Sequence, residues 1–500
     1  MKYYSTRDVE RKEGVTSAQA IKQGIACDGG LFMPESIPEL SYEEIKGMLE
    51  KTYPERAAFV LSKFLTDYTE KELLEIAEKA YSKEKFPDGA VCVSALGENH
   101  RVLELWHGPT CAFKDMALQI LPHLLTSALE KTKEKKTAYI LVATSGDTGK
   151  AALEGFRDVK GIKICVFYPE NGVSELQKKQ MTTQKGENVK VCAITGNFDD
   201  AQSGVKEIFS DKKIAKELEE KKVFLSSANS INWGRLVPQI VYYVSAYCDL
   251  LKDGDIKDKE EIDICVPTGN FGNIFAAYMA KMMGLPVRKL VCASNKNNVL
   301  TDFINTGVYD RNRSFYTTIS PSMDILISSN LERLLYVVAG PEKCKEYMES
   351  LAKTGKYCVD KKTADRIRET FIAQYCDEDN TRKTIHDVFL KYSYLIDPHT
   401  ACAFYASQKT DDENKKEGRN IKIVTASTAS PYKFAKDVMN SLGYADKEEI
   451  FGTIEEMSRV TLTKVPENIA NLKEAQVRFT EKTGKTKEEI WASAEKFLEN

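Results

Sequence analysis

Lys114 is the residue of this chain best suited to covalent chemistry. It lies in the stretch Glu104–Asp115, in the first turn of an amphipathic helix expected over Ala112–Leu125, with Thr110 as its N-cap. An amine at the positive end of a helix, between apolar neighbours, is shifted towards its neutral form. The neutral amine is the form that attacks a carbonyl group to give a Schiff base. The alternative is a solvated surface lysine, which is where most lysines lie.

A glycine-rich turn, Thr268–Asn273, follows the expected strand Glu261–Pro267 and opens a helix. Glycines let the backbone approach a ligand, and the free N–H groups at the start of a helix favour a phosphate. The turn lacks the lysine of the GxxxxGK(S/T) loop and does not match GxGxxG, so it is not a nucleotide-binding loop of the usual kinds. It therefore indicates a phosphate site, with a simple tight turn as the alternative.

Two further polar segments could hold anionic groups. Ser145–Gly149 follows the continuous apolar strand Thr137–Thr144, and its backbone N–H groups and hydroxyls can hold a carboxylate. Asn229–Arg235 places amides, a hydroxyl and a guanidinium within seven residues, and arginine suits bidentate phosphate binding. The alternatives are a helix-capping loop for the first segment and a structural salt bridge for the second.

The segment Thr425–Pro431 lies between the last expected strand, Ile421–Ala426, and its helix. A neutral hydroxyl there can hydrogen-bond a ring nitrogen without protonating it, although simple helix capping is the alternative. A Schiff-base lysine, a phosphate loop and such a hydroxyl together predict a pyridoxal phosphate site. The Asn229–Arg235 segment offers a second anion site, which suggests a phosphorylated substrate.

Strands and helices alternate from about residue 100 onward, which predicts an α/β fold of parallel sheets with ligands at the carboxyl ends of the strands. Residues 1–95 are expected to form a mostly helical N-terminal module. Residues 96–240 are expected to form an α/β domain that carries Lys114, and residues 241–500 a second one that carries the glycine-rich turn, peripheral helices and a C-terminal extension. Residues 409–420 are expected to be a solvated charged loop.

Composition argues against several other classes of protein. The net charge is −3, no basic tract is present, and no apolar run is long enough to span a bilayer. The twelve cysteines are scattered without a CxxC, and the five histidines never pair at ligand spacing. We therefore expect a cytoplasmic protein with reduced thiols, no metal site, no nucleic-acid partner and no membrane association.

Five segments, in this order, resemble the signature segments of the threonine synthase family. They are His107–Asp115, Ser145–Gly149, Asn229–Arg235, Gly269–Asn273 and Ser427–Pro431. The loop Asp28–Pro34 also resembles the N-terminal module of that family's longer subgroup, and the resemblance runs from near residue 4 to about residue 440. It implies the fold-type II architecture of pyridoxal phosphate enzymes, in which two parallel-sheet α/β domains hold the cofactor between them.

The resemblance implies a role for each position that matches. Lys114 would carry the cofactor, and Thr428 would hydrogen-bond its pyridine nitrogen. The cofactor phosphate and the substrate would be held by two further sets of residues, the first being Gly269, Asn270, Phe271, Gly272 and Asn273, and the second Ser145, Gly146, Asp147, Thr148, Asn229, Ser230 and Arg235. Two positions depart from the family, because Cys111 stands where leucine is usual and Ser430 where the subgroup often has histidine.

The implied reaction converts O-phospho-L-homoserine and water to L-threonine and phosphate. One alternative is a phospho-lyase that uses the same site and releases 2-oxobutyrate and ammonia. Another is a catalytically silent protein that binds pyridoxal phosphate or a phosphorylated ligand. The oligomeric state is expected to be a monomer or a homodimer.

Overall fold

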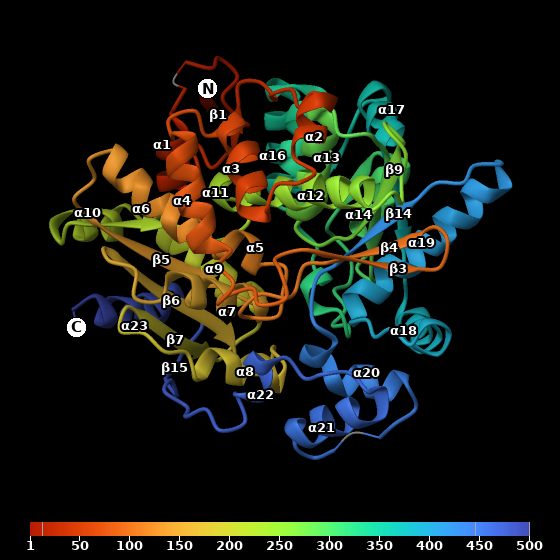
Figure 1. The fold of residues 1–500 in the computed structure, drawn as a ribbon. Coiled ribbons are helices and arrows are strands. Elements are labelled where there is room, and N and C mark those ends of the chain that lie inside the picture. The colour runs from red at the N-terminus through yellow and green to blue at the C-terminus, as the bar shows by residue number, and fades with distance from the viewer. Residues whose placement is uncertain (13, 446, 500) are drawn as a thin grey trace.

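The computed structural model describes residues 1–12, 14–445 and 447–499. Residue 13 of the expected N-terminal module and residues 446 and 500 of the expected third segment lie outside the described part of the chain. The N-terminal segment, red to orange in Figure 1, pairs two short antiparallel strands and adds four helices. These elements are β1 (Tyr3–Ser5), α1 (Ser17–Gln23), β2 (Phe32–Pro34), α2 (Tyr42–Gly47), α3 (Tyr53–Phe64) and α4 (Glu70–Ala80). Capping boxes start α1, α2 and α4, which fixes where these helices begin.

The larger sheet has six strands in the order β13-β10-β9-β14-β4-β3, parallel except for β3 against β4. Its strands are β3 (Cys92–Leu96), β4 (His100–Glu104), β9 (Ile262–Pro267), β10 (Val287–Ser294), β13 (Phe371–Tyr375) and β14 (Ile423–Ser427). Alternate residues of β9 pack into different cores. Ile264 belongs to the core that contains α13 (Gly272–Met283), and Cys265 belongs to one with Ala403 of α19 (Pro398–Lys416). Because side chains alternate along a strand, helices cover both faces of this sheet.

The smaller sheet has five parallel strands in the order β15-β7-β6-β5-β8. They are β5 (Thr137–Ala143), β6 (Ile162–Pro169), β7 (Val189–Ile194), β8 (Val223–Ser226) and β15 (Lys482–Thr483). Along β5, Ile140 belongs to the same core as Ala151 of α7, whereas Leu141 belongs to a core with Val205 of α9. Helices around this sheet are α6 (Leu121–Lys131), α7 (Asp147–Phe156), α8 (Glu175–Thr182), α9 (Phe198–Ser210), α10 (Lys212–Glu220) and α23 (Lys487–Glu499).

The sheets do not follow the expected division of the chain at residues 95 and 240. The β3–β4 hairpin precedes Lys114 but pairs into the larger sheet through β14, and Figure 1 shows it reaching across the molecule. At the other end, β15 and α23 return to the smaller sheet. Apolar patterns reveal that a strand exists, but they do not reveal which strand it pairs with.

Two expected elements are wrong. The helix expected over Ala112–Leu125 is two helices, α5 (Asp115–Leu118) and α6, because Pro122 has no N–H to donate to the carbonyl of Leu118. Most of the solvated loop expected over residues 409–420 belongs to α19, where Thr410, Asp411 and Asn414 are buried.

The remaining helices and strands belong to neither set given above. They are α11 (Trp233–Leu236), α12 (Pro238–Lys252), α14 (Val299–Thr306), β11 (Val308–Asp310), η1 (Pro321–Met323), α15 (Leu331–Ala339), α16 (Pro341–Thr354), β12 (Lys356–Cys358), α17 (Lys361–Thr370), α18 (Glu378–Tyr392), η2 (Pro431–Phe434), α20 (Ala435–Ser441), α21 (Ile450–Thr461) and α22 (Glu467–Ala470). The N-terminal module packs α1 on α6 and α3 on α12.

Candidate active site

Lys114 lies at the N-cap of α5, in a loop that is fixed on both sides. Thr110 is not the N-cap; its N–H and hydroxyl instead donate to the two carboxylate oxygens of Asp115, each at 2.8 Å. Burial raises the pKa of Asp115 to about 6, against the opposing effect of these hydrogen bonds. The N–H of Phe113 donates to the carbonyl of Thr428 at 2.8 Å, so the lysine loop lies against the end of β14.

The amine of Lys114 has two polar neighbours. Its Nζ donates to the hydroxyl of Ser322 at 3.3 Å and lies 3.6 Å from Oδ2 of Asp147. Burial lowers the pKa of Lys114 to about 8; Asp147 opposes this shift, and the positive charges of Arg235 and Lys433 add to it. The amine is therefore much closer to neutral than a surface lysine, as the sequence predicted from its apolar neighbours.

The turn Ser145–Gly149 connects β5 to α7, and hydrogen bonds to Thr144 hold it in place. The hydroxyl of Thr144 accepts hydrogen bonds from the N–H groups of Gly146 at 3.0 Å and Gly149 at 2.9 Å. Ser145 and Thr148 are half-buried, and their hydroxyls make no hydrogen bond to the described residues. These two hydroxyls fit the predicted substrate site.

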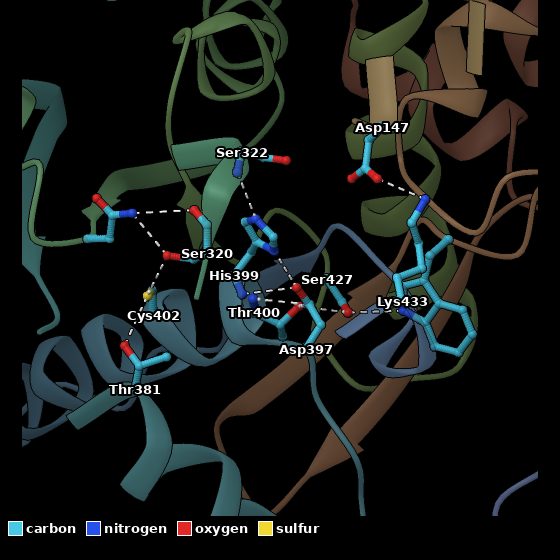
Figure 2. A network of polar contacts seen from close by, with 12 residues as sticks. Asp147, Ser320, Ser322, Thr381, Asp397, His399, Thr400, Cys402, Ser427 and Lys433 are labelled. Carbon is cyan, nitrogen blue, oxygen red and sulfur yellow. Dashed lines mark hydrogen bonds and ion pairs between the residues drawn. The ribbon is translucent and has the colours of Figure 1, made fainter. Parts of the chain in front are cut away.

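Asp147 differs from its two neighbours because its carboxylate is already engaged. Oδ1 forms an ion pair with Lys433 at 2.8 Å (Figure 2). The same oxygen accepts from Nε2 of Gln177 at 2.9 Å. Burial alone would raise the pKa of Asp147, but Lys433 and Lys114 hold it well below its usual range. A negative charge repels a substrate carboxylate, so this geometry does not favour the contact predicted for Asp147.

The glycine-rich turn connects β9 to α13 and requires an unusual backbone. Phe271, the N-cap of α13, is left-handed with φ +62°, which is uncommon for a bulky side chain and typical of functional turns. A Cβ at Gly269 would lie 2.5 Å from the carbonyl oxygen of Ser322. The turn is therefore pressed against the loop that contacts Lys114.

Asn273 supplies a buried donor in this turn. Its Oδ1 accepts from the hydroxyls of Tyr242 and Tyr243, whereas its Nδ2 is buried without a partner among the described residues. A buried donor without an acceptor costs about 1–3 kcal/mol, so an anion that accepts from it is stabilised. Asn270 is exposed, and its carbonyl accepts from the backbone and the side chain of Asn330, each at 3.0 Å.

The segment Asn229–Arg235 reaches the same region from α11. Ser230 accepts from Nδ2 of Asn330 at 3.1 Å, so one asparagine joins this segment to the glycine-rich turn. Arg235 is buried and donates to the carbonyl of Ala228 at 2.8 Å, and its Nε has no partner in the described part of the chain. Burial lowers the pKa of its guanidinium to about 10. The structural salt bridge that was the alternative for Arg235 is absent from the described residues.

Thr428 follows β14 and is buried, and its hydroxyl makes no hydrogen bond to a described residue. Ser430 donates its N–H to the carbonyl of Cys111 at 3.0 Å, and its own hydroxyl is buried without a partner in the described chain. Cys111 and Ser430, the two positions that depart from the family pattern, are therefore joined by a backbone hydrogen bond. A histidine nevertheless lies near this segment, since His399 of α19 stacks edge-on against Phe434 at 4.9 Å.

Sequence reasoning missed the residues that position the site. Nδ1 of His399 lies 2.6 Å from Asp397, and its Nε2 accepts from the N–H of Ser322 at 3.1 Å, as Figure 2 shows. Ser322, Asn330 and His399 stand in no glycine-rich or strand-end motif, so no local pattern reveals them. Lys433 had a usable signal, because it lies in the first turn after the segment Thr425–Pro431.

These residues fit pyridoxal phosphate. Lys114 supplies a partly buried amine of lowered pKa, and the turn Gly269–Asn273 supplies a helix start, a close backbone approach and an orphaned amide donor. Thr428 supplies a neutral hydroxyl at the end of the neighbouring strand. Among the described residues, no group of His, Cys, Asp or Glu side chains could hold a metal ion, and no helix has both the length and the apolar character needed to cross a membrane.

Comparison with known proteins agrees with this fit. The family model described as "Pyridoxal-phosphate dependent enzyme" matches residues 94–427, and the fold and site define a fold-type II enzyme that uses pyridoxal phosphate. The models described as "Threonine synthase N terminus" and "Threonine synthase, C-terminal" match residues 2–81 and 400–490. The chain belongs to the threonine synthase family.

Individual relatives are similar over most of the chain. Threonine synthase of Saccharomyces cerevisiae is 35% identical over 467 residues, which cover 88% of this chain and 89% of the relative. Threonine synthase-like 1 of Pongo abelii is 41% identical over 88% of this chain, but the chain spans only 60% of that relative's length. The crystal structure of pyridoxal phosphate-bound threonine synthase from Brucella melitensis is 34% identical, with a TM-score of 0.86 and coverage of 100% of this chain and 99% of that one.

Proposed function

We propose that this protein is a threonine synthase, which converts O-phospho-L-homoserine and water to L-threonine and phosphate in the last step of threonine biosynthesis. The observation that carries the proposal is the second anion site. Arg235 is a buried guanidinium without a carboxylate partner in the described chain, and it is close enough to Lys114 to lower the pKa of that amine. A phosphorylated substrate is the anion that this charge fits.

Pyridoxal phosphate, when bound to Lys114, supplies the electron sink that stabilises negative charge on substrate carbon. The chain's own residues do the rest. Once released, the amine of Lys114 can accept the proton from the substrate α-carbon and pass protons to and from neighbouring carbons, because its lowered pKa leaves a neutral fraction near physiological pH.

Two of the three polar segments orient the substrate, and the third contacts the cofactor ring. Arg235, Asn229 and Ser230 hold the substrate phosphate, and the hydroxyls of Ser145 and Thr148 with the N–H groups of their turn hold its carboxylate. Thr428 would hydrogen-bond the ring nitrogen as a neutral hydroxyl, which would moderate the electron sink and favour elimination over transamination. The support for these roles is the family resemblance together with the unpaired Nε of Arg235 among the described residues.

The alternative activity is a phospho-lyase at the same site. The relative named "Threonine synthase-like 1" is the reason to test it, since its name asserts similarity and not activity. The purified chain with pyridoxal phosphate and O-phospho-L-homoserine should release threonine and phosphate in equal amounts. Phosphate matched by 2-oxobutyrate and ammonia would make the protein a lyase, and no phosphate release would reject both.

The substrate-phosphate site has its own test. Arg235→Lys keeps a positive charge but loses the forked donor, so we expect KM for O-phospho-L-homoserine to rise about tenfold or more with a smaller change in kcat. Arg459→Lys is the matched control, because Arg459 is largely exposed and pairs with Glu456 on the surface. Equal kinetics of the two variants would remove Arg235 from the substrate site.

A further inference from the structure

One buried carboxylate is shared between two lysines in this site, the buried Lys433 and the partly buried Lys114. Oδ1 of Asp147 is bound by Lys433 at 2.8 Å and by Gln177 at 2.9 Å, so the side chain is fixed and presents Oδ2 to Lys114 at 3.6 Å. Asp147 and Lys433 are 4% and 1% exposed, which means that bulk water does not screen their charges. Figure 2 shows the lysine of η2 extended towards the aspartate at the start of α7.

Lys433 is held in place independently of Asp147. Its Nζ donates to the carbonyl of Thr110 at 2.9 Å, which belongs to the same loop as Lys114. Its backbone N–H donates to the carbonyl of Ser430 at 3.0 Å, which ties it to the end of β14. Lys433 therefore connects the lysine loop, the strand end and the start of α7.

The charges around Lys114 come from three different elements. Asp147 of α7 is the negative one, and Arg235 of α11 and Lys433 of η2 are positive. The uncharged neighbours are the hydroxyl of Ser322 and the ring of Phe113, whose centroid lies 4.9 Å from Nζ. Asp147 favours the protonated amine, whereas burial and both cations favour the neutral amine.

We propose that Asp147 and Lys433 are positioning residues that together set the protonation state of Lys114. Asp147 stabilises the protonated amine through Oδ2. Lys433 forms an ion pair with Oδ1, and its positive charge offsets much of the negative charge that Asp147 presents to Lys114. Because Asp147 acts on Lys114, the substrate carboxylate is assigned to hydroxyl and N–H groups and not to Asp147. The inference rests on the proposed function for its relevance to turnover, but its test does not need turnover.

The test measures Lys114 directly in the full-length chain without cofactor. Trace labelling with acetic anhydride over a pH range, read by mass spectrometry of the Lys114 peptide, gives the midpoint at which the amine becomes reactive. We expect a midpoint near pH 8 for the wild type, a fall of about one unit in Asp147→Asn and a rise of about one unit in Lys433→Met. A merely structural role predicts no opposite shifts, so midpoints that move together or stay fixed would overturn the inference.

The double variant Asp147→Asn/Lys433→Met guards against misfolding of either single variant. It removes one positive and one negative charge, so we expect its midpoint to return close to the wild-type value; a midpoint equal to that of either single variant would overturn the proposal. Lys150→Met is the matched control, since Lys150 is also buried on α7 but pairs with Glu154, and its loss should leave the midpoint within a few tenths of a unit. Shifts in a chain that makes no threonine would reject the proposed function alone, and fixed midpoints in a chain that does make it would reject this inference alone.

Discussion

Two strand-to-helix turns, one after a strand of each sheet, both contain glycines but differ in charge. Ser145–Gly149 joins β5 to α7 in the smaller sheet, and Thr268–Asn273 joins β9 to α13 in the larger sheet. In the first turn the carboxylate of Asp147 is paired with Lys433 and faces Lys114. In the second, the amide Nδ2 of Asn273 is left as a buried donor.

The difference shows that a glycine-rich turn at a strand end does not define its ligand. The Thr268–Asn273 turn carries no charged side chain and offers donors, which suits the phosphate of the cofactor. The Ser145–Gly149 turn carries a buried carboxylate, which instead controls a neighbouring amine. The side chains that complete each turn come from distant parts of the chain, and they decide its chemistry.

The largest effect is expected from a substitution in the glycine-rich turn of the larger sheet. In Gly269→Ala the new Cβ meets the carbonyl oxygen of Ser322 at 2.5 Å, which is backbone and cannot rotate away. We expect the dissociation constant for pyridoxal phosphate to rise about 10- to 100-fold, measured by the absorbance of the bound cofactor.

The matched change in the smaller sheet is Gly146→Ala, where φ is +135° and the Cβ meets the side chain of Gln177. It should raise KM for the substrate while the cofactor affinity stays within a few fold. Gly47→Ala, with no atom within 4 Å of the added Cβ, is the control for both variants. Equal loss of cofactor affinity in Gly146→Ala would erase the distinction between the turns.

The next effect concerns pH. The neutral amine of Lys114 is the form that combines with a carbonyl, and its fraction rises as pH increases towards and past the pKa of about 8. We expect the rate at which the cofactor-free chain combines with pyridoxal phosphate to rise about tenfold per pH unit below 8 and to level off above it. A rate that continues to rise up to about pH 10.4, as for a lysine in solution, would mean that the site does not lower this pKa.

The smallest effect concerns the support of the smaller sheet's turn. Thr144→Val removes the hydroxyl that accepts from Gly146 and Gly149 and leaves two buried N–H groups without that partner. We expect a loss of about 1–3 kcal/mol in the free energy of unfolding, measured by urea denaturation. Thr126→Val, which loses only a half-buried helical hydrogen bond to Pro122, should cost less.

Much of the fold could be predicted because its buried strands are continuous apolar runs. The expected strands Thr137–Thr144 and Glu261–Pro267 agree with β5 and β9 to within one residue at each end, and Ile421–Ala426 agrees with β14 to within two. Strand partners could not be predicted, since β4 pairs with β14, more than 300 residues away. The break between α5 and α6 was missed although Pro122 is visible in the sequence.

The site was predictable where its residues stand in motifs and not elsewhere. The structure brings the loops of Lys114 and Thr428 into direct backbone contact, and Asn330 joins the turn of Asn270 to Ser230. Asn330 and Lys433 were not predicted, because their roles arise only when distant segments pack together. Which positions bind substrate and cofactor stays a prediction from the family resemblance and this geometry.

The most direct test of the account asks which lysine carries the cofactor. Two lysines, Lys114 and Lys433, share Asp147, so the chemistry of the site depends on which one forms the covalent bond. The holoenzyme should be reduced with sodium borohydride, which fixes the cofactor to its lysine, then digested and mapped by mass spectrometry. We predict a single modified position at Lys114; modification of Lys433, or of Lys114 and Lys433 alike, would contradict the account.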